Sequence, residues 1–498
     1  MKKNTVLINI VTSLMLQIIT IISGFVIPRL IISEFGSDVN GLISSITQFL
    51  SYISLLEGGL SGVVMASLYK PLADNDIKKV SGVINATTRF FRQIAIIYIV
   101  YTFVLALVYP LMVPTGYSNG YIFGLVVVLA GNLFIQYFFS LTYKLLLNAD
   151  RKVYFVSLTQ IIIVALNLIL TVVSIRLFGD VLWVKLISLV AFVLQPILYT
   201  SYVKKHYDID KFQKPDNEAL SQRWDGFGQN IAYFIHVNTP IVILTFFCDL
   251  KTVSVYSVYL MIANALKVVS LSISSAIVPS IGNILAKNNK EDTNKAFDLY
   301  EFGMGFVVTL MFSCAMVLSV PFIRVYTLGI TDANYIEPLF CMILMAAEMV
   351  YCLRDPYVSV IYAAGHFRQT AKYAYTEATI NIIISLLMVK KFGIVGVATG
   401  MLVSMVYRMI TQVVYLKKDI LFRNIKSFVK KILVFGFGTV AIVYISVNYI
   451  ISDSQSYIMW LFDAVKTGIF ALIIMILISF VFFKKDVVCM VGSKLKKR

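Results

Sequence analysis

The sequence IAIIYIVYTFVLALVYPLM (residues 94–112) is followed, after the short polar stretch PTGYSNG (114–120), by YIFGLVVVLAGNLFIQYFF (121–139). No charged residue occurs from position 93 to position 143. Each apolar run is long enough to cross the hydrocarbon core of a bilayer as an α-helix. Continuous apolar runs also exclude a transmembrane β-barrel, whose strands alternate apolar and polar side chains. The pair therefore predicts two membrane-spanning helices joined by a short turn.

Such runs recur along all 498 residues, of which 59% are hydrophobic and only 14% are charged, with a mean hydropathy of +0.84. This composition excludes a soluble globular protein and predicts an all-α polytopic membrane protein with about 14 transmembrane helices. The predicted spans are 7–32, 41–67, 91–113, 120–143, 153–175, 181–203, 227–248, 254–282, 301–323, 336–363, 372–389, 393–416, 431–451 and 457–483.

The hydrophilic segments between these spans predict the orientation of the chain. Segments on the side of the N-terminus contain 32 Lys and Arg residues, whereas those on the opposite side contain six. Under the positive-inside rule both termini are cytoplasmic. The formal net charge of +17 is then explained by loops that meet anionic lipid headgroups, so we expect no nucleic-acid partner.

Several kinds of chemistry are disfavoured by the sequence. Four of the five cysteines lie in apolar runs and no two are close in sequence, so we expect neither a disulfide framework nor a metal site. The sequence contains no G-x-x-x-x-G-K-[ST] motif, which excludes an encoded ATP-driven domain, and we expect no cofactor. The predicted outer loops are too short for the active site of a polysaccharide polymerase or ligase. We therefore predict that the protein is not an enzyme.

The chain repeats itself weakly with a period near 213 residues. Pro28 matches Pro240, and the pair Lys204–Lys205 matches Lys417–Lys418. Because each repeat contains six spans, both halves insert in the same orientation, which predicts two six-helix lobes related by a pseudo-two-fold axis along the membrane normal. Such lobes are typical of alternating access around a site near mid-membrane. The predicted parts are an N-terminal lobe at 1–210, a C-terminal lobe at 211–425, and two extra helices with a basic cytoplasmic tail at 426–498.

Three stretches carry a resemblance to a known family: LLEGGLSGVVMASLYKPLADNDIKKVSGVINATTRFFRQI (55–94), KLLLNADRKVYF (144–155) and KPDNEALSQRWDGFGQNIA (214–232). They resemble bacterial Wzx-type flippases of polysaccharide repeat units, which belong to the multidrug/oligosaccharidyl-lipid/polysaccharide (MOP) exporter superfamily. The predicted layout of six, six and two spans agrees with this resemblance across the whole chain.

The resemblance implies transport of undecaprenyl-diphosphate-linked oligosaccharides, of capsule, exopolysaccharide or O-antigen type, across the bacterial plasma (inner) membrane by alternating access. It implies a cavity in which Arg and Lys bind the diphosphate, and a groove for the prenyl tail at the last two helices. Membrane lipids are further partners that it implies, and polysaccharide polymerase and glycosyltransferases are candidate partners.

Five basic residues lie inside predicted spans. A charge at the centre of a bilayer costs about 2.5–3.5 kcal/mol on insertion scales, so such residues usually face a bundle interior or a wet cavity. Three of them belong to the second lobe at comparable depth, and we predict that these bind the diphosphate, since Arg binds phosphate oxygens bidentately. The alternative is that the three form structural ion pairs. The five are Arg29, Lys267, Arg354, Arg408 and Lys466, and the three in question are Lys267, Arg354 and Arg408.

Other polar residues in the spans have weaker predicted roles. Arg29 follows Pro28 near the outer end of the first span, where it either contacts the substrate late in the cycle or extends to the outer headgroups. Lys466 follows Asp463 by three residues, which predicts an i,i+3 ion pair near the outer surface. His236 is alone in its span and is expected to form a helix-packing hydrogen bond.

Carboxylates in the spans are candidates for a coupling site or for the cavity wall. Glu57 precedes two glycines, which allow a bend or a close helix approach, and it is a candidate proton or cation site. Glu348 lies six residues before Arg354 and could neutralise it. Asp355 could face a cation of another helix, and Glu377 is expected at the membrane interface.

Three alternatives remain open at this point. A cation-coupled drug or organic-cation antiporter has the same fold, but its cavity should be acidic and twelve spans would suffice for it. A lipid II-type flippase also shares the fold. In a membrane scaffold of a glycan-assembly complex, neutralising the intramembrane cations would change nothing. The basic residues and the extra pair of helices favour the lipid-linked oligosaccharide.

Overall fold

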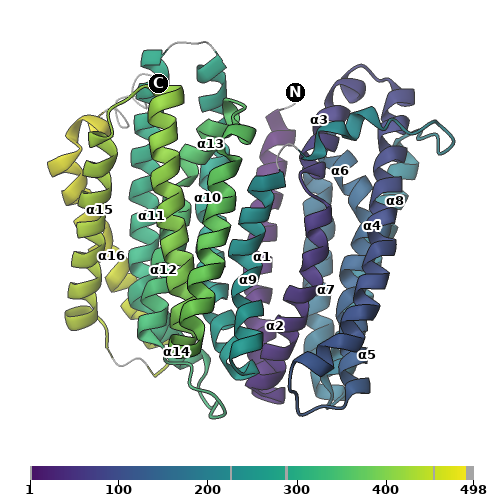
Figure 1. Cartoon of the computed structure of the whole chain (residues 1–498), viewed down its shortest axis with the longest axis horizontal. Helices are drawn as coiled ribbons and strands as arrows, with labels where there is room; N and C mark the ends of the chain where they lie inside the picture. The colour runs from purple at the N-terminus through teal and green to yellow at the C-terminus, as the bar shows by residue number, and fades with distance from the viewer. Residues whose placement is uncertain (1–2, 225–226, 287–289, 453–454, 489–498) are drawn as a thin grey trace. The chain divides into compact units, whose positions relative to one another are not determined.

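The computed structural model describes residues 3–224, 227–286, 290–452 and 455–488 (Figure 1). These residues form helices and short connections and contain no strand, which confirms the all-α prediction. Of the basic tail predicted at the C-terminus, Lys484 and Lys485 are described, whereas Lys494, Lys496, Lys497 and Arg498 lie outside the described residues, as does Cys489. The helices up to position 224 are α1 (Lys3–Phe35), α2 (Ser37–Ser51), η1 (Tyr52–Leu56), α3 (Leu60–Ala73), α4 (Ile77–Met112), α5 (Asn119–Ile135), η2 (Gln136–Ser140), α6 (Leu141–Ala149), α7 (Val153–Leu177), α8 (Val181–His206) and η3 (Glu218–Trp224).

The remaining helices continue the same pattern of long apolar segments. They are α9 (Phe227–Phe247), α10 (Leu250–Ala286), α11 (Lys290–Tyr326), α12 (Pro338–Leu353), α13 (Asp355–Ala363), α14 (Phe367–Tyr415), η4 (Leu416–Leu421), α15 (Lys426–Ile445), η5 (Ser446–Ile450) and α16 (Tyr457–Phe482). Twelve helical stretches of the described residues are long and apolar enough to cross a membrane. The chain is accordingly a multi-pass membrane protein.

Two local features account for the difference between these twelve stretches and the fourteen predicted spans. The predicted span 336–363 is divided between α12 and α13, neither of which is long enough by itself. The predicted spans 372–389 and 393–416 both lie in α14, which is one continuous stretch of helix by hydrogen bonding. Counting α12 with α13 as one pass and the halves of α14 as two gives the predicted number of about fourteen.

A proline explains the junction between α12 and α13. Pro356 has no backbone N–H and cannot donate the helical hydrogen bond to the carbonyl of Cys352. It stands instead in the first turn of α13, where a proline is favoured. Arg354 is the cap residue shared by the two helices. The junction thus fixes a cation between two helix ends.

A glycine explains the sharp bend inside α14. Gly393 has φ 52° and ψ −128°, a conformation that side chains other than that of glycine rarely adopt. The two halves of α14 then pack against each other in antiparallel fashion, with the Ser385 hydroxyl donating to the Val397 carbonyl at 3.4 Å. A methyl group at Gly400 would lie 2.3 Å from Ser385 Oγ, so this contact requires a glycine.

The predicted span 41–67 is interrupted in the middle. After α2 the chain forms the 3₁₀ turn η1, and α3 begins only at Leu60. Gly58 has φ 55°, so the bend that its sequence allowed is present. Glu57 lies in this interruption, as the C-cap residue of η1.

The chain divides into two compact units. The first comprises Met1–Phe234 and Cys248–Ser254, and the second comprises Ile235–Phe247 and Val255–Arg498. In the first unit α7 packs against α1 and α8, and α4 packs against α5. In the second unit α12 packs against α14, while α11 contacts α12, α15 and α16. The division at 210 and 425 inferred from the sequence repeat stays a prediction.

The last two helices are attached to the second unit through α11, beside which they are drawn in yellow in Figure 1. Phe302 of α11 and Phe435 of α15 belong to a common apolar core. The ring of Phe435 fits over Gly305, where an added methyl group would lie 2.5 Å from it. The Ser313 hydroxyl also donates to the Thr439 hydroxyl at 3.2 Å. Close packing over a small residue and a hydrogen bond between helices are the means by which helices associate in lipid.

Candidate functional site: a buried charge cluster

Six ionisable residues of the second unit are buried together on four long helices. All six have exposed fractions between 1% and 8%. Burying a charge costs several kcal/mol unless it is paired and hydrogen-bonded, so the arrangement of partners decides what such a group can do. The six, with Tyr351 between them, are called the charge cluster: His236 of α9, Lys267 of α10, Glu348 of α12, Arg354 at the α12–α13 junction, and Glu377 and Arg408 of the two halves of α14.

One half of the charge cluster is centred on Glu348. Lys267 Nζ lies 3.2 Å from Glu348 Oε2, and His236 Nε2 lies 3.2 Å from Glu348 Oε1. Neither Glu348 Oε2 nor His236 Nε2 has a partner with hydrogen-bond geometry in the described part of the chain, so these contacts are ionic and poorly directed. Helices α9, α10 and α12 meet at this carboxylate.

The other half of the charge cluster is centred on Glu377. Arg354 Nη1 donates to Glu377 Oε2 at 3.3 Å, and Arg408 Nε lies 3.4 Å from the same oxygen. Arg408 Nη1 also donates to the carbonyl of Thr370 at 3.4 Å. Both guanidinium groups therefore converge on one oxygen atom of one carboxylate.

The ring of Tyr351 joins the two halves. Lys267 Nζ lies 5.3 Å and the Arg354 guanidinium carbon 4.6 Å from its centroid, which are cation–π distances. The imidazole of His236 stacks on the same ring, with centroids 5.2 Å apart and planes 6° from parallel. One aromatic ring thus contacts a cation of each half.

Besides His236, the charge cluster contains three basic side chains, Lys267, Arg354 and Arg408, and two carboxylates, Glu348 and Glu377. Asp355 accepts hydrogen bonds from the hydroxyls of Ser274 and Tyr300, and it lies within electrostatic range of Arg354. The two arginines that share one carboxylate oxygen can bind an anion that carries more than one negative charge.

The structure also corrects two expectations for the carboxylates. The partners of Glu348 are Lys267 and His236, so it does not neutralise Arg354. Glu377 is not an interfacial residue, because it is 2% exposed and pairs with both arginines. Sequence reasoning missed Glu377 because its burial depends on the antiparallel packing of α14, which one glycine produces.

Two further predicted residues lie elsewhere. Arg29 is a partly buried residue of α1 and belongs to the first unit, whereas the charge cluster belongs to the second. Lys466 Nζ lies 3.2 Å from Asp463 Oδ1 on α16, so the predicted i,i+3 ion pair is confirmed.

Glu57 has a polar environment of its own in the first unit. The Ser61 hydroxyl donates to Glu57 Oε1. The hydroxyl of Tyr137 and the ammonium group of Lys144 lie within electrostatic range of this carboxylate. Tyr137 belongs to the π-helical turn η2, and π-turns are frequent at functional sites. Glu57 therefore lies in a helix interruption and interacts with a residue of a π-turn.

A second group of buried charges joins α11 to α15, and we call it the α11–α15 ion-pair group. Its centre is Glu301 of α11, whose Oε2 lies 2.6 Å from Lys431 Nζ and 3.0 Å from Arg423 Nη2. The hydroxyl of Tyr357 donates to the other oxygen, Oε1. Asp298 adds a contact of 2.8 Å with Arg423. Each oxygen of Glu301 is therefore hydrogen-bonded.

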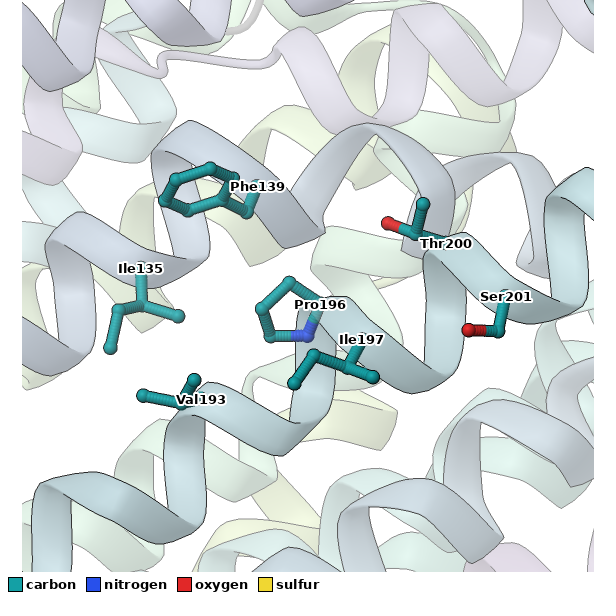
Figure 2. Close-up of a pocket in the computed structure, with 7 residues that line it drawn as sticks. All are labelled: Ile135, Phe139, Val193, Pro196, Ile197, Thr200 and Ser201. Carbon is teal, nitrogen blue, oxygen red and sulfur yellow. The ribbon is translucent and has the colours of Figure 1, made fainter.

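A groove of about 480 Å³ lies between α5–η2 and α8 in the first unit. Figure 2 shows Pro196 and Ile197 of α8 facing Ile135 and Phe139 of the neighbouring helix. Its lining contains no charged or amide side chain, so it cannot bind a charged head group. Its remaining lining residues are Val193, Thr200 and Ser201.

Comparison with solved structures identifies the architecture. The lipid II flippase MurJ, in an inward closed conformation, matches with a TM-score of 0.73 and 15% identity over 97% of this chain and 100% of that chain. This chain shares the fold of that flippase. An inward-facing multidrug resistance MATE transporter of the MOP superfamily matches the same fold with a TM-score of 0.66 and 15% identity, over 78% of this chain and 93% of that chain.

A third MOP-type structure, the MATE multidrug transporter DinF-BH, matches with a TM-score of 0.61 and 17% identity over 85% of this chain and 97% of that chain. A scan with models of known protein families finds no match, and a search of curated proteins finds no relative. These structural neighbours are transporters and flippases rather than enzymes. At such low identity the likeness concerns the fold, and the substrate has to be argued from the buried side chains.

Proposed function

We propose that this protein is a flippase that moves undecaprenyl-diphosphate-linked oligosaccharide repeat units from the cytoplasmic to the outer leaflet of a bacterial plasma membrane. The observation that carries the proposal is the convergence of Arg354 and Arg408 on one carboxylate oxygen, with Lys267 on the Tyr351 ring that Arg354 also contacts. The fold supports a lipid-linked substrate, since the flippase that matches along its whole length acts on lipid II. That likeness also keeps a lipid II-type substrate as an alternative.

In this proposal the charge cluster binds the diphosphate head group. The two arginines lie 3.3 and 3.4 Å from one carboxylate oxygen, so both can reach a single small anion at that place. Planar guanidinium groups bind phosphate oxygens bidentately, and Lys267 contributes a compact charge beside them. We assign Arg29 of the first unit to a later contact with the same substrate, during its release.

The hydrophobic tail of the substrate would remain in lipid during transport. We place it along α15 and α16, whose outer faces carry exposed apolar side chains such as Phe437, Val440 and Tyr444. The sugars would then occupy the polar interior, and alternating access would expose the head group first to the cytoplasm and then to the outside.

The membrane potential is the proposed driving force. Moving net negative charge outward is favoured by an inside-negative potential at about 2.3 kcal/mol per charge per 100 mV. A cation that returns through Glu57 would add to this force. If translocation in vesicles proceeded at the same rate after the potential had been collapsed, this part of the proposal would be wrong.

The proposed topology places both termini in the cytoplasm, as the distribution of Lys and Arg predicts. Glycosyltransferases that assemble the repeat unit would act on the cytoplasmic side, and a polymerase would receive it outside. Labelling of single cysteines introduced near each terminus tests the orientation directly.

The decisive experiment is translocation in liposomes. Undecaprenyl-diphosphate oligosaccharide is loaded into one leaflet, and its arrival in the other is followed by its accessibility to an added enzyme. Wild type is compared with Arg354→Ala/Arg408→Ala and with Lys466→Ala, a control that removes an intramembrane cation outside the charge cluster. We expect transport by wild type and by the control, and its loss in the double variant.

Each other outcome has a definite meaning. Transport that persists in the arginine double variant would retain the flippase and reject the charge cluster as its binding site. A well-folded wild type that moves no lipid-linked oligosaccharide would reject the function and favour a drug antiporter or a scaffold role.

A cation-coupled antiporter of drugs or organic cations is the second candidate. The carboxylate of Glu57 at an interrupted helix and the likeness to MATE transporters favour it. Uptake of a fluorescent organic cation into the same vesicles, driven by a proton or sodium gradient and lost in Glu57→Gln, would support it.

A further inference from the structure

Two buried carboxylates of the second unit each hold two cations, and the quality of their bonding differs. Glu301 lies 2.6 Å from Lys431 Nζ and 3.0 Å from Arg423 Nη2, and its second oxygen accepts from Tyr357. Glu377 lies 3.3 and 3.4 Å from its two arginine atoms, beyond the 2.7–2.9 Å that is usual for charge-assisted bonds. Glu301 is therefore tightly bonded to its two cations, whereas Glu377 is loosely bonded to its two.

The loose bonding of Glu377 extends to the geometry of its contacts. Both arginine contacts fall on Oε2, whereas Oε1 is buried and has no hydrogen-bond partner in the described part of the chain. The contact with Arg408 Nε also lacks hydrogen-bond geometry. A buried carboxylate left underbonded in this way pays much of its desolvation cost without compensation. Glu348 Oε2 also lacks a hydrogen-bond partner among the described residues, but the two contacts of Glu348 fall on different oxygens, whereas both contacts of Glu377 fall on one.

We propose that Glu377 is a displaceable counter-ion that sets the selectivity of the arginine pair for a diphosphate. It neutralises Arg354 and Arg408 while no substrate is present, and the substrate anion takes its place. This inference rests on the proposed function, since it assumes that the arginine pair binds the head group. Glu377 is thus a specificity-determining residue that competes with the substrate.

Competition between Glu377 and the substrate for the two arginines explains a preference for diphosphates over monophosphates. A monophosphate has fewer oxygens and less charge than a diphosphate, so it competes less well with a carboxylate that is already in place. A diphosphate can bond to both guanidinium groups at the same time. The same competition weakens binding overall and allows the carboxylate to return when the head group leaves, which assists release.

The test compares the binding of farnesyl diphosphate and farnesyl monophosphate to the purified full-length protein in detergent, by the ligand dependence of the unfolding temperature. Wild type is compared with Glu377→Gln, which removes the competing charge and keeps the shape. Glu301→Gln is the matched control, since it neutralises a buried acid that also holds two cations.

We expect wild type to prefer the diphosphate by about tenfold or more, which corresponds to about 1.4 kcal/mol. In Glu377→Gln the diphosphate should bind about tenfold more tightly, and the monophosphate should gain more, so that the preference shrinks. In translocation assays this variant should have a lower KM and a lower kcat, because release is slower. Glu301→Gln should unfold at a lower temperature with unchanged dissociation constants for both ligands.

If Glu377→Gln does not fold, Glu377→Asp serves instead, because the shorter side chain keeps the charge and retracts it from the arginines. It should also bind both ligands more tightly than wild type does. Unchanged or weaker binding in the folded variant would overturn the inference. If wild type nevertheless bound the diphosphate, and Arg354→Ala abolished this binding, the proposed function would stand and only the role of Glu377 would be rejected. Should neither wild type nor any Glu377 variant bind either ligand, both would fall.

Discussion

The pairing of Lys267 with Glu348 offers a quantitative test of how the charge cluster is stabilised. The two side chains are 6% and 1% exposed, and Nζ lies 3.2 Å from Oε2. Lys267→Met keeps a similar length and removes the charge, so Glu348 retains only His236 as a cationic partner among the described residues. The variant therefore leaves a buried carboxylate that is only partly compensated.

The expected cost follows from the geometry. At 3.2 Å and an effective dielectric constant of about 20, the attraction between two unit charges is about 5 kcal/mol. Removing one partner of a buried pair typically destabilises a protein by about 3–5 kcal/mol. We take the lower end of this range, because His236 remains 3.2 Å from Glu348 Oε1, and expect a loss of about 3 kcal/mol. For units of this size that corresponds to a fall in Tm of about 6–12 °C.

The matched variant is Lys267→Met/Glu348→Met, which removes both charges. Replacing a whole buried pair by apolar side chains is often close to neutral, because the desolvation cost of both ions disappears. We therefore expect the double variant to recover to within about 3 °C of the Tm of wild type. The assay is thermal unfolding of the purified protein in detergent, followed by intrinsic fluorescence.

Equal losses of Tm in the single and the double variant would refute the reasoning, since they would mean that Lys267 stabilises the unit through packing rather than through its charge. If the double variant is stable, it can also be tested for transport. If Lys267 contributes to binding of the head group, this folded protein should not translocate the substrate. A double variant that is both stable and fully active would reduce the binding site to the two arginines.

Three further predictions concern the backbone and the second ion-pair group. Gly400→Ala places a methyl group against Ser385 and should destabilise the second unit by about 1–3 kcal/mol. In the control Gly436→Ala the added methyl group meets no atom within 4 Å, so the Tm measured in parallel thermal unfolding should stay the same or rise. Gly58→Ala forces a non-glycine residue to φ 55°, at a cost of about 1 kcal/mol or more, and should lower the translocation rate by displacing the neighbouring acid. Glu301→Gln should lower the Tm by weakening the attachment of α15, and limited proteolysis should then cut the connection between α14 and α15 faster than in wild type.

The sequence predicted the class of the protein and the depth of the charges because both follow from local composition. A run of apolar residues must be helical in lipid, and a cation inside it must face protein or water. The identity of each partner could not be predicted in this way. Arg354 and Glu377 are 23 residues apart and belong to different helices, so their contact depends on how those helices pack. The same holds for Lys267 and Glu348.

Two residues, Pro356 and Gly393, account for the differences between the predicted spans and the observed helices. Pro356 lies in a predicted span of 28 residues, where its missing N–H ends one helix and begins another at Arg354. Gly393 follows two lysines and a phenylalanine, and the sequence pattern indicated a loop there. The structure instead forms a bend of a single residue, since glycine alone readily adopts φ 52° and ψ −128°.

The same fold is compatible with more than one class of substrate. The lipid II flippase and the MATE transporter match with TM-scores of 0.73 and 0.66 at the same 15% identity, so one architecture serves a lipid-linked anion and multidrug transport. The buried side chains of this chain are therefore the basis for choosing among these substrates. Here the ring of Tyr351 contacts two buried cations, Lys267 and Arg354, and Arg354 shares one carboxylate oxygen of Glu377 with Arg408. A diphosphate that displaced Glu377 could bond to both guanidinium groups at once, whereas the carboxylate contacts them with a single oxygen at 3.3 and 3.4 Å.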